Sequence, residues 1–129
     1  MAYDTEIAAA TVWMEASGEG TAGMQAVACV IANRLRKRHF GTTLAAVCLM
    51  PKQFSCWDTD NSRRVALAVA SDDDPYLKIA RQCVYNALSR PEVDHTQGAL
   101  YYFAKDLTAP VWAASMTVTV TIGKHRFLK

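Results

Sequence analysis

One short stretch decides how the first half of this chain folds, and it reads Trp13-Met14-Glu15-Ala16-Ser17-Gly18-Glu19-Gly20. Apolar residues at helical spacing precede it and predict a helix over residues 5–17, with Glu15 in the last turn beside the apolar face. Gly18 and Gly20 then stop that helix. The negative end of a helix and the apolar Trp and Met beside it both disfavour an ionised carboxylate. Glu15 is therefore a candidate proton donor of the kind that glycosidic bond cleavage requires.

Each glutamate of this stretch also has a purely structural explanation. Glu15 could equally be a solvent-exposed acid at a helix end, or a cap for a neighbouring helix. Glu19 lies just before the next predicted helix, where an acid stabilises the positive end of the helix dipole.

Length and composition are those of one ordinary globular domain. The 129 residues suffice for a single domain over residues 1–129, and a domain of this size buries roughly two thirds of its surface without metals or disulfides. The net charge of +2, from 14 Lys and Arg against 12 Asp and Glu, is too small to indicate nucleic acid as a partner. No apolar run is long enough to span a bilayer, so we expect no stable membrane insertion.

The basic residues gather at two places, which we read as solvated positive surface. An attraction to an anionic polymer such as a bacterial wall is the alternative, and the lack of interleaved aromatic residues argues against nucleic acid. The first group comprises Arg34, Arg36, Lys37, Arg38 and His39, and the second Lys124, His125, Arg126 and Lys129.

The spacing of cysteine and histidine indicates no metal site, and we expect no cofactor. Cys29 and Cys83 fall in apolar helical patterns, which predicts buried free thiols, with one disulfide as the alternative outside the cytoplasm. Residues 1–6 carry two acids and no base, unlike a secretory signal peptide. We therefore expect synthesis in the cytoplasm.

Capping residues predict where the main helices begin. Asp4 is the expected cap of the helix over 5–17, and Thr21 that of a helix over 22–37. Asp74-Pro75 predicts the start of a helix that ends near residue 89. The residues of this last helix expected in the core are Leu77, Ala80, Val84, Ala87 and Leu88.

The rest of the pattern predicts loops and a late sheet. A short helical turn is expected over 44–48, and residues 58–74 read as loop with one helical turn at 65–69. Alternating β-branched residues predict a strand over 117–122, and a tight turn then leads to a partner strand over 125–128. The predicted class is α+β, mainly helical, with a small hairpin or sheet near the end of the chain.

Aromatic, amide and hydroxyl side chains in the loops and extended segments are candidates for binding sugars, because aromatic faces stack on sugar rings and polar groups bind sugar oxygens. The alternative is that these aromatics anchor their segments in the core. Asp94 and His95 could supply a second acid and a base, whereas no Gly-x-Ser-x-Gly setting supports a nucleophilic serine. The candidate substrate-binding residues are Glu19, Gln53, Phe54, Ser55, Tyr101, Tyr102 and Trp112.

Segments spread over the chain carry a resemblance to a known family. They are residues 12–20, 23–28 and 30–34, then Gln53-Phe54-Ser55-Cys56-Trp57, Gly98-Ala99-Leu100-Tyr101-Tyr102-Phe103, Val111-Trp112-Ala113 and Ile122-Gly123-Lys124-His125-Arg126-Phe127. In this order the chain resembles the SleB-like (spore-cortex-lytic) cell-wall hydrolases over nearly its whole length.

The resemblance implies a lysozyme-like α+β fold and cleavage of the β-1,4 bond between N-acetylmuramic acid and N-acetylglucosamine in peptidoglycan. Family members are commonly lytic transglycosylases with one catalytic glutamate, which corresponds to Glu15, while Glu19 matches the family's second glutamate. Such an enzyme forms a 1,6-anhydro product without a second carboxylate. A hydrolytic muramidase would need a second acid, for which Asp58 and Asp94 are candidates.

Three positions depart from the family pattern: Met14 replaces a small residue, Ser17 an arginine and His95 a proline. They affect local loop contacts and substrate preference and leave Glu15 in place. A bare catalytic domain made in the cytoplasm resembles a phage or prophage endolysin, which would reach the periplasmic cell wall through a holin and act as a monomer on glycan strands. A fragment of a longer bacterial enzyme would look the same. A non-catalytic wall-binding module and a helical interaction protein are the competing functions.

Overall fold

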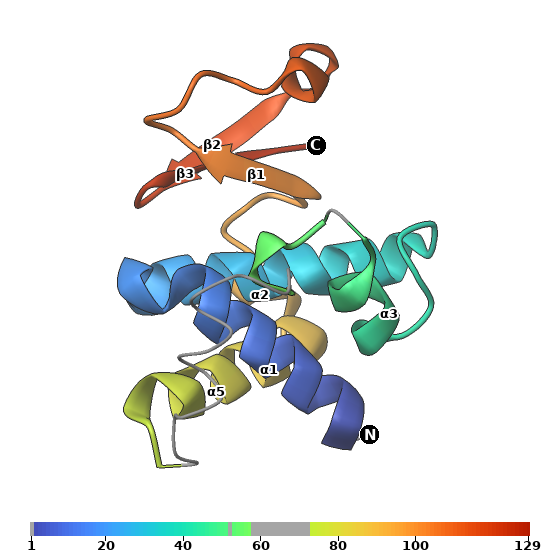
Figure 1. Ribbon diagram of the computed structural model, residues 1–129, viewed down its shortest axis with the longest axis vertical. Coiled ribbons are helices and arrows are strands. Elements are labelled where there is room, and N and C mark those ends of the chain that lie inside the picture. Colours follow the sequence, from blue (N-terminus) through green and yellow to red (C-terminus); the bar gives the residue numbers. More distant parts are fainter. Residues whose placement is uncertain (1, 52, 58–72) are drawn as a thin grey trace.

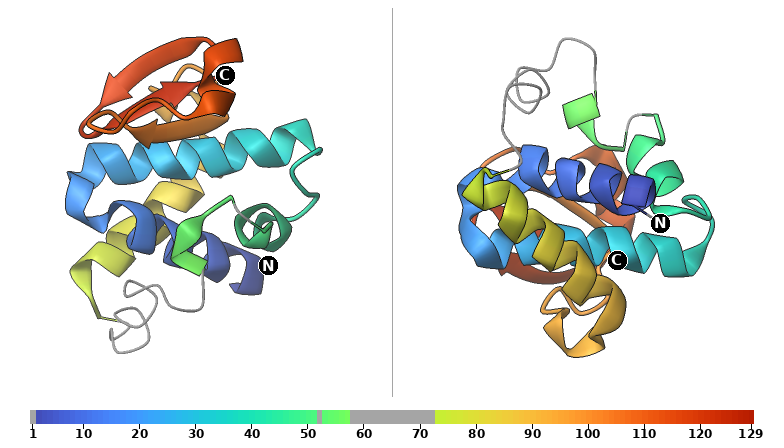
Figure 2. Two further views of the ribbon diagram at one scale, coloured as in Figure 1. Left: turned by 45° about the horizontal axis from the view of Figure 1, so that its top comes forward. Right: turned by 90° about the horizontal axis from the view of Figure 1, so that it is seen from below.

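The helix α2 (Gly20–Lys37) lies at the centre of the fold (Figure 1). A computed structural model of the chain describes residues 2–51, 53–57 and 73–129. The helices α1 (Ala2–Ala16) and α5 (Pro75–Ser89) pack against one side of α2, and a three-stranded sheet covers the opposite side (Figures 1 and 2). The short α3 (Leu44–Leu49), a predicted turn that is confirmed, packs against α1 and α2. The expected loop and turn over residues 58–72 lie outside the described residues.

Two groups of buried side chains explain this central position. On the helical side, Met24, Val27 and Ile31 of α2 belong to the main core that α2 shares with α1, α3 and α5. On the sheet side, Ala26 and Val30 of α2 pack against Phe127 and Ala99. Because α2 is buried from both sides, its position fixes that of the sheet relative to the other helices.

The break between the first two helices forms where the glycines predict it. The helix α1 ends at Ala16, the 3-10 turn η1 (Ser17–Glu19) follows, and Gly20 has a φ of 79° where α2 begins. That conformation favours glycine, because a side chain would be strained there.

Both predicted caps of these helices are wrong. Because α1 already begins at Ala2, Asp4 lies within its first turn, and its Oδ1 accepts the backbone N–H of Ala45 in α3 at 3.3 Å. Because Gly20 makes the chain reversal itself, α2 begins before Thr21, which lies inside the helix.

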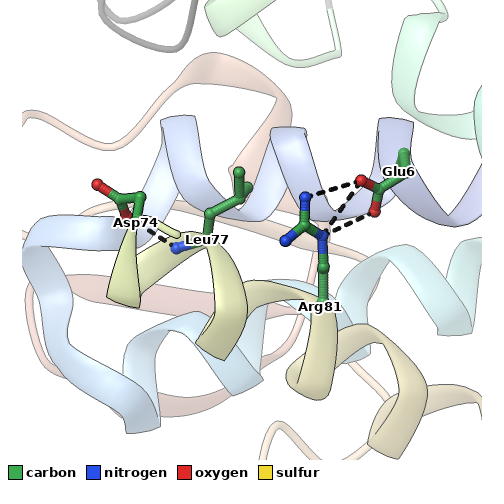
Figure 3. A network of polar contacts seen from close by, with 4 residues as sticks. All are labelled: Glu6, Asp74, Leu77 and Arg81. Atoms are coloured by element: carbon green, nitrogen blue, oxygen red, sulfur yellow. Dashed lines mark hydrogen bonds and ion pairs between the residues drawn. The ribbon is translucent and has the colours of Figure 1, made fainter. Parts of the chain in front are cut away.

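The predicted start of α5 is confirmed, and it ties this helix to α1. Asp74 Oδ1 accepts the backbone N–H groups of Tyr76 and Leu77 at 2.9 and 3.0 Å, and also the indole N–H of Trp13 at 3.1 Å. Further along, Arg81 donates to both carboxylate oxygens of Glu6 (Figure 3).

The prediction that Leu88 belongs to the core of α5 is wrong. Leu88 is 38% exposed, whereas Cys83 of the same helix is buried. The buried face therefore runs through Ala80, Cys83 and Ala87 and turns away from Leu88 in the last turn.

The predicted late sheet is confirmed, and it contains one strand more than the two that were predicted. Its strands are β1 (Tyr101–Ala104), β2 (Val118–Ile122) and β3 (His125–Leu128), in the order β1-β3-β2 and antiparallel throughout. The chain therefore has the predicted α+β class. Among the described residues, no helix combines the length and the apolar character needed to cross a bilayer.

The cap at Asp74 makes stability depend on pH. The hydrogen bond from the Leu77 N–H, with those from Trp13 and Tyr76, lowers the pKa of Asp74 below its ordinary 3.8. A lowered pKa in the folded state stabilises the protein above the unfolded-state pKa, and this contribution is lost as the pH falls through the folded-state value. Asp74→Asn should therefore lower the Tm at pH 7, and its difference from the wild type should shrink below pH 3.8. Thermal denaturation followed by circular dichroism from pH 7 to pH 2 measures this.

Asp73→Asn is the matched control for this prediction. Its carboxylate is almost fully exposed and forms a 3.8 Å ion pair with Lys78, and exposed pairs contribute little. A Tm difference for Asp74→Asn that stays constant down to pH 2 would contradict the assignment.

Candidate active site

Glu15 lies half-buried in the last turn of α1, at the edge of a cleft of about 470 Å³. The walls come from α1, α2, the segment around Gln53, β1, and the 3-10 helix η4 (Val111–Ser115) with the residue after it. Six of the eight candidates from the sequence line this cleft, and Glu19 and Phe54 do not. The lining residues are Glu15, Arg34, Gln53, Ser55, Tyr101, Tyr102, Trp112 and Met116.

A second hollow also has Glu15 in its wall. It has a volume of about 590 Å³ and is formed by the end of α1, the turn η1 and Tyr76 of α5. Glu15 belongs to the lining of both hollows, and Glu19 lines the second. Glu15 is therefore the residue that the walls of the two hollows share.

The Glu15 carboxyl group affects two buried groups that can donate protons, Tyr102 and Cys56. The Tyr102 hydroxyl donates to Glu15 Oε1 at 2.5 Å. Burial, followed by the nearby Glu15 carboxylate, raises the pKa of Tyr102 well above 10.0. Cys56 is also buried, and burial followed by the charge of the Glu15 carboxylate raises the pKa of its thiol strongly. Both groups consequently remain hydrogen-bond donors at neutral pH.

Aromatic side chains form much of the cleft. Trp112 is 43% exposed, and its ring lies 5.6 Å from that of Tyr101 and 6.2 Å from that of Phe103. Phe54 is buried, and its ring centroid lies 6.5 Å from that of Tyr102. Phe54 thus supports the cleft from beneath, whereas Trp112 presents an accessible ring.

Arg34 is a cleft residue that the sequence reasoning placed wrongly. It was grouped with the solvated basic residues, yet it is 4% exposed. Its guanidinium carbon lies 4.9, 5.1 and 5.2 Å from the ring centroids of Phe40, Phe54 and Tyr101. Helical spacing held the signal, because position 34 follows Val27 by seven residues and so continues the apolar stripe of α2.

Glu19 links the turn η1 to the sheet. Its Oε1 accepts the backbone N–H of Lys124 at 2.9 Å and lies 3.9 Å from His125 Nδ1. The His125 ring in turn packs against Tyr102, with centroids 4.8 Å apart. Glu19 therefore holds the β2–β3 turn beside the residue that contacts Glu15, and its predicted role in substrate binding stays a prediction.

Asp94 is occupied by structural hydrogen bonds and lines neither hollow. Its carboxylate accepts from the Asn33 side chain, from the backbone N–H and hydroxyl of Thr96, and from the Gly98 N–H. Burial would raise the pKa of Asp94, but these hydrogen bonds outweigh it and lower the pKa. Asp58, the other candidate second acid, lies outside the described residues.

The four cysteines are buried free thiols, as the helical patterns of Cys29 and Cys83 predict. In the part of the chain that the structure describes, no group of three or more His, Cys, Asp or Glu side chains is placed to hold a metal ion.

Comparison with known proteins identifies the family. The model of the cell wall hydrolase family matches residues 18–128. This chain belongs to the cell wall hydrolase family. The resemblance to SleB-like hydrolases seen in the sequence is thus confirmed, although the family match begins just after Glu15.

Individual relatives extend the similarity over the whole chain. Spore cortex-lytic enzymes of Bacillus cereus and Bacillus subtilis are 33% and 31% identical to it over 98% and 96% of its length. The chain spans only 44% and 37% of these two relatives.

Solved structures confirm the lysozyme-like α+β fold. The catalytic domain of Bacillus cereus SleB superimposes with a TM-score of 0.77 at 30% identity, covering 100% of this chain and 91% of that domain. The catalytic domain of SleB from Bacillus anthracis, a germination-specific lytic transglycosylase, gives a TM-score of 0.75 at 29% identity, covering 98% and 93%.

The contact of Glu19 with the sheet predicts separate effects for two substitutions. Glu19→Ala removes the acceptor of the Lys124 N–H, which should lower the free energy of unfolding by about 1–3 kcal/mol. Glu19→Gln keeps a side-chain oxygen there and should be milder. Chemical denaturation measures the stabilities, and hydrogen exchange of the Lys124 amide reports the contact itself. Equal, unchanged exchange in both variants would contradict the role of Glu19 in holding this turn.

Proposed function

We propose that this chain cleaves the glycan strands of peptidoglycan at the β-1,4 bond between N-acetylmuramic acid and N-acetylglucosamine, as a lytic transglycosylase with Glu15 as its general acid and base. The observation that carries the proposal is that Glu15 lines both hollows. Membership of the cell wall hydrolase family supports the same substrate.

The shape of the site suits a linear polymer. A glycan strand that occupies both hollows passes the Glu15 carboxyl group, so that one glycosidic bond comes within its reach. In the aromatic cleft, Trp112 offers a ring face for a sugar, and Gln53 and Ser55 offer polar groups for sugar oxygens. These roles for the lining residues follow from their chemistry.

In the proposed reaction the Glu15 carboxyl group acts twice, first as an acid and then as a base. Protonated Glu15 donates to the glycosidic oxygen while the bond from that oxygen to C1 of the muramoyl sugar breaks. The Glu15 carboxylate then takes the proton of the C6 hydroxyl of the same sugar, whose oxygen bonds to C1 and closes a 1,6-anhydro ring. The Tyr102 hydroxyl donates a hydrogen bond that stabilises the carboxylate between these steps.

The hydrolytic muramidase is the second candidate mechanism. It requires a second carboxylate that positions water or forms a covalent intermediate. Glu15 is the single acid among the described residues that line the aromatic cleft, which favours transglycosylation. Glu19, which lines the neighbouring hollow, is engaged by the Lys124 N–H.

Delivery and assembly are also proposals. If a phage or prophage encodes the chain, a holin would give it access to the periplasmic wall, where it would act as a monomer.

Replacing the acid tests the enzyme assignment. Glu15→Gln keeps an oxygen for the Tyr102 hydroxyl but removes the transferable proton, so the release of muropeptides from purified sacculi should fall by at least about 100-fold. Its Tm should remain near that of the wild type. A folded Glu15→Gln variant that clears permeabilised Gram-negative cells as fast as the parent would remove Glu15 from catalysis. Wild-type protein that binds sacculi and releases nothing would show a wall-binding module instead.

Mass spectrometry of the released fragments distinguishes the two mechanisms. Transglycosylation yields 1,6-anhydromuramoyl ends. Hydrolysis yields reducing ends, which are heavier by the mass of one water, about 18 Da. We expect the anhydro form.

The Tyr102 hydroxyl should act on the chemical step. Tyr102→Phe removes one hydrogen bond to a charged group, which corresponds to a loss of about 10- to 100-fold in kcat. KM should change little, because the hydroxyl donates its hydrogen bond to Glu15. Tyr85→Phe, on the exposed side of α5, is the matched control and should leave the rate unchanged. A rise in KM with unchanged kcat would contradict this assignment.

A further inference from the structure

The guanidinium group of Arg34 brings a positive charge to the cleft that no described acid neutralises. Within residues 2–51, 53–57 and 73–129, Arg34 forms no ion pair with a carboxylate. Its Nε donates to the Leu100 carbonyl oxygen at 2.6 Å, and its Nη1 donates to Gln53 Oε1 at 3.0 Å. A buried cation without a counter-ion is costly, and the aromatic rings around it offset only part of that cost.

The remaining nitrogen of Arg34 is open to the cleft. Its Nη2 has no protein acceptor among the described residues. Among the described residues, His125 Nδ1 is the only side-chain nitrogen or oxygen that is both fully buried and without a partner. Arg34 Nη2 lacks a partner as well, so it is not fully buried. Nη2 is therefore accessible, and Arg34 is a lining residue of the cleft.

Arg34 also fixes the orientation of the Gln53 amide. A guanidinium group can only donate hydrogen bonds, so the atom of Gln53 that faces it must be Oε1. The NH₂ group of Gln53 is consequently the end left for the cleft, and it has no partner in the described protein. Arg34 and Gln53 together present adjacent donors, a positive charge and no free acceptor.

We infer that Arg34 and Gln53 form a carboxylate-binding corner of the cleft, which recognises an acidic group carried by the muramoyl sugars of the substrate. This inference rests on the proposed function. A carboxylate supplies acceptors for both donors and neutralises the cation in a site of low dielectric. In peptidoglycan such a group belongs to the lactyl substituent where no peptide is attached, and to the peptide stem elsewhere.

Binding of small muramoyl probes tests the inference on the intact chain. N-acetylmuramic acid carries the lactyl carboxylate, its methyl ester is neutral, and muramyl dipeptide carries its carboxylate on the peptide. Titrations followed by the ¹H–¹⁵N resonances of the backbone amides at position 53 and at Tyr101 should show that N-acetylmuramic acid, muramyl dipeptide or both bind about tenfold more tightly than the ester. Tighter binding of the first alone assigns the lactyl group, and tighter binding of the dipeptide assigns the stem. Equal affinities for all three probes would overturn the inference.

Gln53→Glu provides a charge-reversal variant that keeps the fold. The new carboxylate still accepts from Arg34 Nη1, but it neutralises the cation and repels an acidic ligand. The affinity for the acidic probe should fall at least tenfold, while that for the methyl ester should stay within about twofold, so that the preference is lost. Gln82→Glu, the same change on the exposed side of α5, should retain the preference. A Gln53→Glu variant that still prefers the acid would overturn the inference.

The binding experiments are independent of catalysis, because the monosaccharide probes contain no glycosidic bond that the protein could cleave. Release of muropeptides from sacculi without any preference for the acid would leave the proposed function standing and reject the corner. A preference for the acid in a protein that releases no muropeptides would reject the enzymatic function and keep the corner.

Discussion

The hydrogen bond from the Tyr102 hydroxyl to Glu15 joins β1 to the end of α1 across the cleft. A second contact, between Glu19 and the Lys124 N–H, joins the turn η1 to the β2–β3 turn. Both glutamates of one short stretch therefore connect the helical layer to the sheet. Glu15 also lines the two hollows. One side chain therefore connects the two layers and is the candidate acid.

Small residues make this arrangement possible. A Cβ atom at Gly23 would lie 2.4 Å from the Cβ of Glu19, so a side chain there would displace Glu19 from the sheet. Gly123 has a φ of 59°, and a Cβ there would come within 3.0 Å of Glu19 Oε1. The approach of the helix break to the β2–β3 turn consequently depends on glycine at both sides.

Features set by neighbouring residues were predictable from the sequence. The cap at Asp74 and the β2–β3 hairpin depend on a few adjacent residues, and the structure has both. Most of the predicted sugar-binding candidates also converge on one cleft. Asp4 and Thr21 were assigned to the wrong positions because the hydrogen-bonding capacity of a side chain does not reveal which backbone group it will meet. The environment of Arg34 depends on Phe40, Phe54 and Tyr101, which tertiary structure alone brings together.

The central claim is that a glycan strand lies across both hollows with a glycosidic oxygen at the Glu15 carboxyl group. A crystal structure of the Glu15→Gln variant with a peptidoglycan tetrasaccharide tests it most directly. The account predicts sugars in both hollows and a glycosidic oxygen at about 3 Å from the side chain at position 15. A tetrasaccharide bound on another face, or held in one hollow with every glycosidic oxygen out of hydrogen-bonding reach of that side chain, would contradict it.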